Sequence, residues 1–240
     1  MKGRFSWSHA VLSGWGVQLP TKHTVPMTSF PAALICVHFS SLGYARLGGG
    51  QVLQQRLGLR PGEVTTLVPE DICFPEEVTG IPNGMIIIGV GMRKGTKLKR
   101  PQAAYLDPSK NGDVAELLRR FKRSTPPGHR LVPHSLDCWR RMLKEVESRL
   151  NLTVGWTPHS GRAGFASEMK ALGMPFLEIR EAGRWTMDAS LRVYIDTISA
   201  VSITTMLQHK GLVPALQWAR ACWLNFCTEP LLAAAYPNQI

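Results

Sequence analysis

Several hydrogen-bonding side chains interrupt apolar stretches of this sequence at spacings that suit helices. They are Arg60, Glu63, His159, Arg162, Trp185 and Tyr194. In "TPHSGRAGFASEMKALG", residues 157–173, His159 and Arg162 stand three positions apart and are therefore neighbours on one side of a helix. Trp185 follows where a second helical pattern ends, and Tyr194 stands nine residues later between two apolar residues.

These residue types suit the transfer of a phosphoryl group. Guanidinium groups such as those of Arg60 and Arg162 bind phosphate oxygens bidentately and stabilise the charge that develops on them. An imidazole, here that of His159, titrates near neutral pH and can move a proton. A tyrosine hydroxyl, here that of Tyr194, can act as a covalent nucleophile when neighbouring cations offset its pKa of about 10. A lysine on a hairpin can protonate the leaving alkoxide.

The composition indicates a soluble globular protein with a polyanionic partner. The chain has 240 residues, of which 44% are hydrophobic and 19% are charged. These fractions are ordinary for a globular protein and too apolar for a disordered one. Lys and Arg number 28 against 17 Asp and Glu, which gives a net charge of +11. Such an excess favours nucleic acid as the partner, with a merely basic soluble protein as the alternative.

Cysteine usage and hydropathy exclude several other classes. The five cysteines are scattered and form no CxxC pair, which predicts reduced thiols in an intracellular protein without a zinc cluster. The longest apolar runs fall short of the roughly 18 residues of a membrane span. Polar residues interrupt the N-terminal apolar region, so we do not expect a signal peptide.

Two helices and a small sheet are expected in the first half of the chain. Helical patterns run from about residue 30 to 57, interrupted at glycines 48–50, and a short strand is expected near Ile72. Residues 85–92 and 102–106 predict a β-hairpin. Its basic tip carries Arg93, Lys94, Lys97, Lys99 and Arg100. Such a tip can lie along a phosphate backbone or can simply be solvated, and both interpretations remain open.

Helices dominate the second half. After a polar connection, residues 136–150 form an amphipathic pattern with Ser135 as N-cap. The helix of residues 157–173 is expected to be capped by Thr157 and to end before Gly173. Its core stripe is expected to be Phe165, Met169 and Leu172.

Shorter helical patterns follow at residues 174–185 and 188–199, with Asp188 as a candidate cap, and continue to about residue 226. The order of helices, small sheet and helices predicts an α+β protein that is mostly α. Residues 211–227 are hydrophobic on nearly all sides and require a buried slot, either on a neighbouring subunit or on their own domain.

Four segments resemble, in order, the conserved boxes of the tyrosine recombinase (phage integrase) family. "GLRPGEVTTLVPEDI" resembles the first box, in which Glu follows Arg by three residues, and "RKGTK" resembles the hairpin with the catalytic Lys. "TPHSGRAGFAS" resembles the His-x-x-Arg box, although Ala163 replaces a residue that is often polar. "AGRWTMDASLRVYID" resembles the last box, where His or Trp precedes the nucleophilic Tyr by nine residues. The resemblance covers about residues 28–200.

The resemblance implies the fold and the role of each site residue. The fold would be the family's helical catalytic domain with a small three-stranded antiparallel sheet. Arg60 and Arg162 would clamp the scissile phosphate, His159 would assist proton transfer, and Trp185 would donate its indole N–H or pack under the site. Glu63 would orient its neighbours.

The remaining implied roles concern bond making and breaking. Tyr194 would form a 3′-phosphotyrosyl link, and Lys94 would protonate the 5′-hydroxyl leaving group. A register slip of the hairpin would put Lys97 or Lys99 in place of Lys94. Because the covalent bond conserves the phosphodiester energy, the reaction would need neither a cofactor nor a metal.

The function implied is site-specific DNA recombination or integration by a homo-oligomer on double-stranded DNA, as in mobile elements. Alternatives are a type IB topoisomerase-like enzyme that nicks and reseals one strand, a catalytically inactive domesticated DNA-binding module, and a basic scaffold. We expect the protein to meet its DNA in a nucleus, or in a nucleoid and cytoplasm, and we expect no membrane partner.

Three parts are expected along the chain: an N-terminal tail or fragment (1–27), a catalytic domain (28–205) and a C-terminal helical extension (206–240). The family usually has a helical core-binding domain ahead of the catalytic one. We expect that domain to lie on a separate partner or to have been lost.

Overall fold

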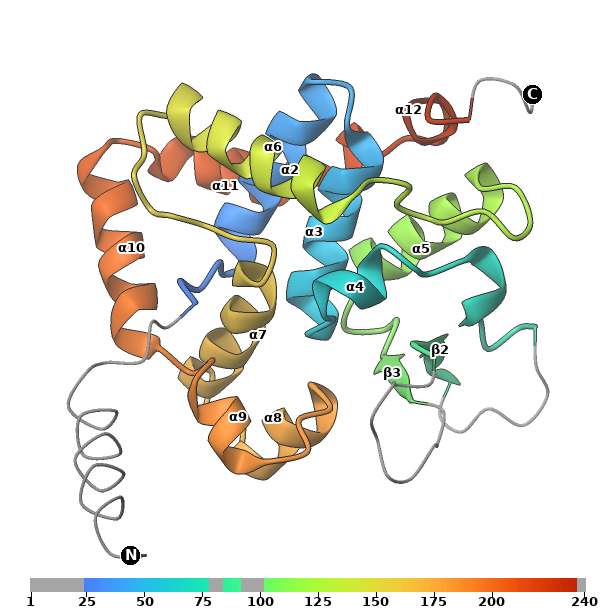
Figure 1. Cartoon of the computed structure of the whole chain (residues 1–240), viewed down its shortest axis with the longest axis horizontal. Helices are drawn as coiled ribbons and strands as arrows, with labels where there is room; N and C mark the ends of the chain where they lie inside the picture. Colours follow the sequence, from blue (N-terminus) through green and yellow to red (C-terminus); the bar gives the residue numbers. More distant parts are fainter. Residues whose placement is uncertain (1–23, 78–83, 92–101, 237–240) are drawn as a thin grey trace, which may run out of the picture.

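Two adjoining helices, α2 (Ser29–Ser41) and α3 (Ala45–Leu57), form the centre of the structure. The computed structural model describes residues 24–77, 84–91 and 102–236. Helix α7 (Ser160–Ala171) contacts α3, and α11 (Val213–Cys222) contacts α2 (Figure 1). The largest buried side chains of this core include Phe39, Leu47, Leu53, Phe121 and Trp139.

The glycine run at 48–50 does not interrupt the helices, so that expectation is wrong. The break falls at Gly43, which has φ +83, whereas the run lies inside α3. A Cβ at Gly48 would lie 2.8 Å from the Cys36 carbonyl oxygen, and one at Gly49 would lie 2.8 Å from the Phe121 ring. The glycines therefore allow α3 to approach its neighbours closely.

A three-stranded antiparallel sheet follows, as predicted. The elements are α4 (Pro61–Val64), η1 (Pro69–Asp71), β1 (Ile72–Cys73), β2 (Ile86–Gly89) and β3 (Ala103–Leu106). The strand order is β1-β2-β3, with Ile72 opposite Ile88 and Ile87 opposite Tyr105. Along β2, buried Ile86 and Ile88 alternate with half-buried residues, which is the two-residue period of a strand.

Helix α5 (Gly112–Ser124) occupies the stretch expected to be a polar connection, so that expectation is wrong. Val114, Leu117, Leu118 and Phe121 are fully buried at the spacing of one helix face. Helix α6 (Leu136–Arg149) agrees with the prediction, and the Ser135 hydroxyl accepts a hydrogen bond from the Cys138 amide at 3.1 Å. The Ser135 cap is therefore confirmed.

The boundaries of α7 differ from the prediction. The helix begins at Ser160 with His159 at the N-cap position, so Thr157 is not the cap. Phe165 is buried, but Leu172 is 74% exposed and was wrongly assigned to the core. Gly173 lies beyond the helix end with φ +85, as expected.

Residues 188–199 form two helices and not one. Helix α8 (Phe176–Ala182) is followed by α9 (Asp188–Arg192) and α10 (Thr197–His209). Asp188 is the first residue of α9 and not its cap, while Asp196 caps α10 by accepting from the Ser199 amide at 2.9 Å. Tyr194 consequently lies in the turn between α9 and α10.

The C-terminal elements are α11, η3 (Trp223–Phe226) and α12 (Glu229–Ala233). Leu216, Trp223 and Leu232 are buried in the main core, so this segment occupies a slot on its own domain. The boundary expected between residues 205 and 206 falls inside α10. Within the described part of the chain, no helix has the length and apolar character to cross a membrane.

Candidate active site

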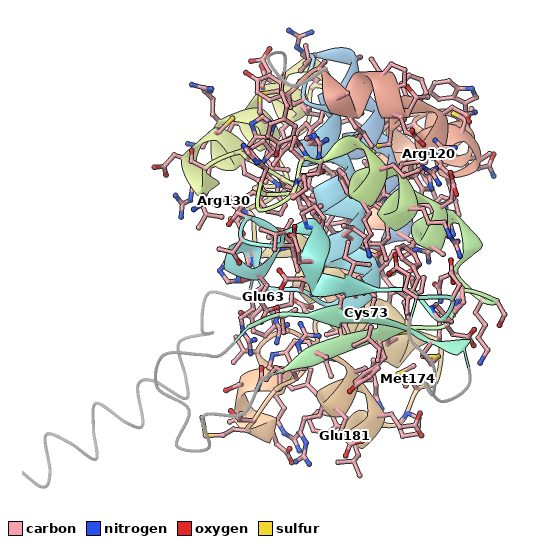
Figure 2. All side chains as sticks on the ribbon, turned by 90° about the vertical axis from the view of Figure 1, so that its right-hand side faces the viewer. Glu63, Cys73, Arg120, Arg130, Met174 and Glu181 are labelled. Carbon is pink, nitrogen blue, oxygen red and sulfur yellow. The ribbon has the colours of Figure 1, made fainter. Side chains whose placement is uncertain are left out.

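An open cavity of ≈ 390 Å³ lies where α4, α7 and the α8–α9 segment meet. Its lining residues are Arg60, Arg162, Trp185, Thr186, Ser190, Val193 and Tyr194. Figure 2 shows Glu63 in the α4 turn, above the α8 segment that carries Glu181. The fold thus brings four of the residues predicted from the sequence to one cavity, and two more lie in contact with them.

Arg162 is a buried cation at the floor of this cavity. It is 1% exposed, and its guanidinium donates to the carbonyl oxygens of Gly58 and Gly183. Its guanidinium carbon lies 4.0 Å from the centroid of the Trp185 ring. Burial, and then repulsion by Arg60, lowers the pKa of Arg162 to about 9, so the group stays charged at neutral pH. A buried cation held by neutral carbonyls favours the approach of an anion.

Arg60 lies at the N-cap of α4 and pairs with Glu63 one turn later. Its Nη1 donates to Glu63 Oε1 at 2.5 Å, and its backbone amide donates to Oε2 at 2.7 Å. Burial lowers the pKa of Arg60, while the Glu63 carboxylate counteracts this shift. The predicted orienting contact of Glu63 on Arg60 is therefore present in the geometry.

Tyr194 reaches His159 from the turn after α9. The Tyr194 hydroxyl lies 3.4 Å from Nδ1 of His159, which remains exposed at the start of α7. Desolvation, followed by the charges of Arg162, Arg140 and Arg60, lowers the pKa of His159 below its ordinary value of 6.5. The imidazole is therefore neutral at pH 7 and able to accept a proton.

Trp185 packs under the site. Its ring stacks on Phe165 with centroids 6.4 Å apart and lies 5.6 Å from the Tyr194 ring. Its Nε1 atom is buried and has no hydrogen-bond partner among the described residues. An indole donor without a partner at a cavity wall is suited to an anionic ligand.

Two contacts fix the segments that carry these residues. The Ser167 hydroxyl on α7 donates to the Tyr194 carbonyl at 3.1 Å and accepts from the Asp196 amide at 3.0 Å. One turn earlier on α7, a Cβ at Gly164 would lie 1.7 Å from the Met27 carbonyl oxygen. Glycine at 164 therefore permits residues 24–28 to lie directly on α7.

The predicted site residues and the observed cavity residues do not coincide completely. Lys94, the expected general acid, and the other basic residues of the hairpin tip lie outside the described residues; these are Arg93, Lys97, Lys99 and Arg100. Conversely, sequence reasoning missed Thr186 and Ser190, whose side chains line the cavity, and Arg184, which contacts Glu63. The one sequence signal for Arg184 was its position directly before Trp185.

Comparisons with known proteins agree with this architecture. The structure is similar to the crystal structure of XerA recombinase, with a TM-score of 0.53 and 17% identity, over 78% of this chain and 66% of that chain. It is also similar to the XerH site-specific recombinase bound to its difH substrate in a pre-cleavage complex. There the TM-score is 0.49 and the identity 12%, over 72% of this chain and 50% of that chain. Neither family models nor curated proteins match the sequence.

The likeness to XerA establishes the fold. The chain has the architecture of a tyrosine recombinase catalytic domain, as the resemblance of its four sequence boxes implied. The chain spans about two-thirds of the length of XerA.

Proposed function

We propose that this protein cleaves and rejoins DNA strands as a tyrosine recombinase, with Tyr194 as nucleophile. The observation that carries the proposal is the convergence of Arg60, Arg162, Trp185 and Tyr194 on one cavity, with His159 beside the tyrosine hydroxyl. Packing against Phe165 accounts for the contact of Trp185 with Tyr194, but it does not require two arginines and a histidine beside them. Phosphoryl transfer through a covalent tyrosine intermediate can use each of these groups.

The first step is nucleophilic attack on a DNA phosphodiester. Arg60 and Arg162 bind the non-bridging oxygens, and the free indole N–H of Trp185 donates to the same group. The Tyr194 hydroxyl loses its proton to the neutral His159 imidazole and forms a bond to phosphorus. The product is a 3′-phosphotyrosyl enzyme.

The same step breaks the bond between phosphorus and the 5′-oxygen. That oxygen takes a proton from a general acid, which we assign to Lys94 because "RKGTK" resembles the family's hairpin with the catalytic Lys; Lys97 and Lys99 are the alternatives. A second 5′-hydroxyl then attacks the phosphorus of the phosphotyrosyl link, in the reverse of the first step. Its oxygen forms the new phosphodiester bond, and Tyr194 is released. The number of phosphodiester bonds is unchanged, so no nucleotide hydrolysis is required.

Double-stranded DNA is the substrate that the charge of the chain favours. The net charge is +11, and exposed cations of α6 include Arg140, Arg141 and Lys144. Such a surface binds DNA largely through phosphate contacts, so affinity should fall steeply as salt rises. Recombination between two sites, as in the integration of a mobile element, requires a homo-oligomer, and a separate core-binding domain would complete the grip on DNA. We assign the protein to the compartment that holds this DNA.

The test is the capture of a covalent adduct. The full chain is incubated with a pool of nicked duplexes of random sequence, in which loss of a short strand traps the phosphotyrosyl enzyme. We expect an adduct for the wild type and none for Tyr194→Phe, which still binds the DNA. Tyr105→Phe is the matched control, because Tyr105 is 63% exposed on β3.

Other outcomes distinguish the alternatives. Binding to DNA without an adduct from any duplex would identify an inactive DNA-binding module. Adducts that reseal the same strand and never exchange partners would identify a topoisomerase-like activity.

A further inference from the structure

Arg184 contacts both members of the Arg60–Glu63 pair. Its Nη2 atom donates to Oε2 of Glu63 at 2.8 Å, and its side chain is only 7% exposed. Its carbonyl oxygen accepts a hydrogen bond from Nη2 of Arg60 at 3.2 Å. One residue therefore supports the pair through its side chain and through its backbone.

The backbone at this position does not favour arginine. Arg184 has φ +57, in the left-handed region that glycine adopts most easily. Among the non-glycine residues that the structure describes, only Asn151 shares this conformation. A glycine at this position would lose the ion pair with Glu63 and the hydrogen bond from Nη1 to the Ala182 carbonyl.

The Glu63 carboxylate is shared between two guanidinium groups. Oε1 accepts from Arg60 at 2.5 Å, and Oε2 accepts from Arg184 at 2.8 Å. The guanidinium groups of Arg60, Arg162 and Arg184 and the carboxylate of Glu63 together carry a net charge of +2. Without Arg184, the carboxylate would neutralise Arg60 alone.

This charge matters to a bound phosphate. A phosphodiester carries one negative charge, and the equatorial oxygens carry more in the transition state of its transfer. A site in which Glu63 cancels Arg60 would offer Arg162 as its one uncompensated guanidinium. Arg184 is absent from the residues that line the cavity, and its side chain contacts the Glu63 carboxylate and the Ala182 carbonyl, so we place its effect on a bound phosphate in the ion pair with Glu63.

Resting on the function proposed above, we infer that Arg184 is a positioning residue of the phosphate site. It holds and neutralises Glu63 and so keeps the Arg60 guanidinium available to a phosphate anion. The ligand class is a phosphodiester or its simplest analogue, inorganic phosphate.

A calorimetric titration of the full chain with inorganic phosphate tests this role without DNA cleavage. We expect Arg184→Gly, which suits the left-handed backbone, to weaken binding at least about tenfold, as loss of a charge-assisted contact does. Arg184→Lys keeps the charge and should stay within about threefold of the wild type. In a Glu63→Gln background, Arg184→Gly should change the affinity by less than about twofold, since there is no carboxylate to neutralise.

The matched control is a remote carboxylate that is also shared by two arginines. Asp113 accepts from Arg56 at 3.3 Å and from Arg220 at 3.2 Å, so Arg220→Ala should leave phosphate binding unchanged. A protein that shows the expected coupling but never forms a DNA adduct would retain this role of Arg184 and lose the proposed function. The inference is overturned if Arg184→Gly binds phosphate like the wild type, if the loss is equal in both backgrounds, or if the wild type binds no phosphate.

Discussion

The hydroxyl of Tyr194 lies 3.4 Å from Nδ1 of His159, although 35 residues separate the two in the chain. The ring centroids are 6.5 Å apart, and the guanidinium carbon of Arg162 lies 5.9 Å from the centroid of the tyrosine ring. The phenol therefore has a proton acceptor, the neutral imidazole, and a buried cation close to it, as a tyrosine nucleophile requires. The predictions below follow from this relationship and from the contacts that maintain it.

The rate of adduct formation is expected to fall on the acid side. Burial and the charges of Arg162, Arg140 and Arg60 hold the pKa of His159 below 6.5. His159 accepts a proton from Tyr194 only while neutral, which is the case above this lowered pKa. The rate should therefore be full at neutral pH and fall about tenfold per pH unit below that pKa. Single-turnover assays between about pH 5 and 8 would measure it.

Arg140→Gln is expected to move this acid limb to higher pH, because Arg140 is one of the cations that disfavour the imidazolium. The matched control is Arg141→Gln, since the neighbouring Arg141 points to Cys138 Sγ at 3.8 Å. An acid limb that stays in place with Arg140→Gln would contradict the assignment of His159 as the proton acceptor.

Arg162→Lys is expected to slow adduct formation at least about 100-fold, since a lysine cannot bond two carbonyls and present a fork to phosphate. Arg46 is the control, because it is equally buried and donates to the carbonyls of Leu131 and Leu232, away from the cavity. Arg46→Lys should lower the thermal unfolding temperature yet leave the rate of the folded protein within about twofold. Equal rates for the two variants would refute a role for Arg162 in the reaction.

Ser167→Ala is expected to slow adduct formation by about three- to tenfold, with DNA affinity unchanged. The variant loses the hydroxyl contacts to the Tyr194 carbonyl and the Asp196 amide, each worth about 1 kcal/mol. The tyrosine then samples positions away from His159. Ser109→Ala, which removes an exposed hydroxyl bonded to Asp107, serves as the control. If both variants react at the wild-type rate, the hydroxyl of Ser167 does not position the tyrosine.

Gly164→Ala is expected to destabilise the fold by at least about 2 kcal/mol, because the new methyl group meets backbone that cannot move aside. Its Cβ would lie 1.7 Å from the Met27 carbonyl oxygen. Gly112→Ala is the matched change, since a Cβ there meets nothing within 4 Å. Denaturant unfolding of the two variants measures the difference, and similar midpoints would show that residues 24–28 do not lie on α7 in solution.

Much of the fold could be predicted because its signals are local. The Ser135 cap and the Gly173 end of α7 depend on neighbours within a few residues, and the hairpin strands around Ile87 and Tyr105 follow from short apolar runs. The same holds for the spacing of His159 and Arg162, which one helical turn places together. Even α5 had a local signal in its apolar spacing, so that error lay in the interpretation of the sequence.

The predictions that were wrong concern positions whose surroundings are formed by segments distant in the sequence. Gly48 and Gly49 read as helix breakers, yet α2 and Phe121 lie so close that only glycine fits inside α3. Leu172 fits the apolar stripe of α7, but the helix ends where nothing covers it.

By itself, the sequence determined which residue types make up the candidate site: two arginines, a histidine, a tryptophan and a tyrosine. It also determined the spacing of His159 and Arg162 by three residues, that of Trp185 and Tyr194 by nine, and the strongly basic character of the chain. Only the tertiary structure decided that Arg162 is buried against the Trp185 ring, that Tyr194 lies in a turn beside His159, and that Arg184 shares Glu63 with Arg60. The reason is physical. Spacing along a helix depends on backbone geometry alone, whereas burial, pKa shifts and shared ion pairs depend on which distant segments pack together.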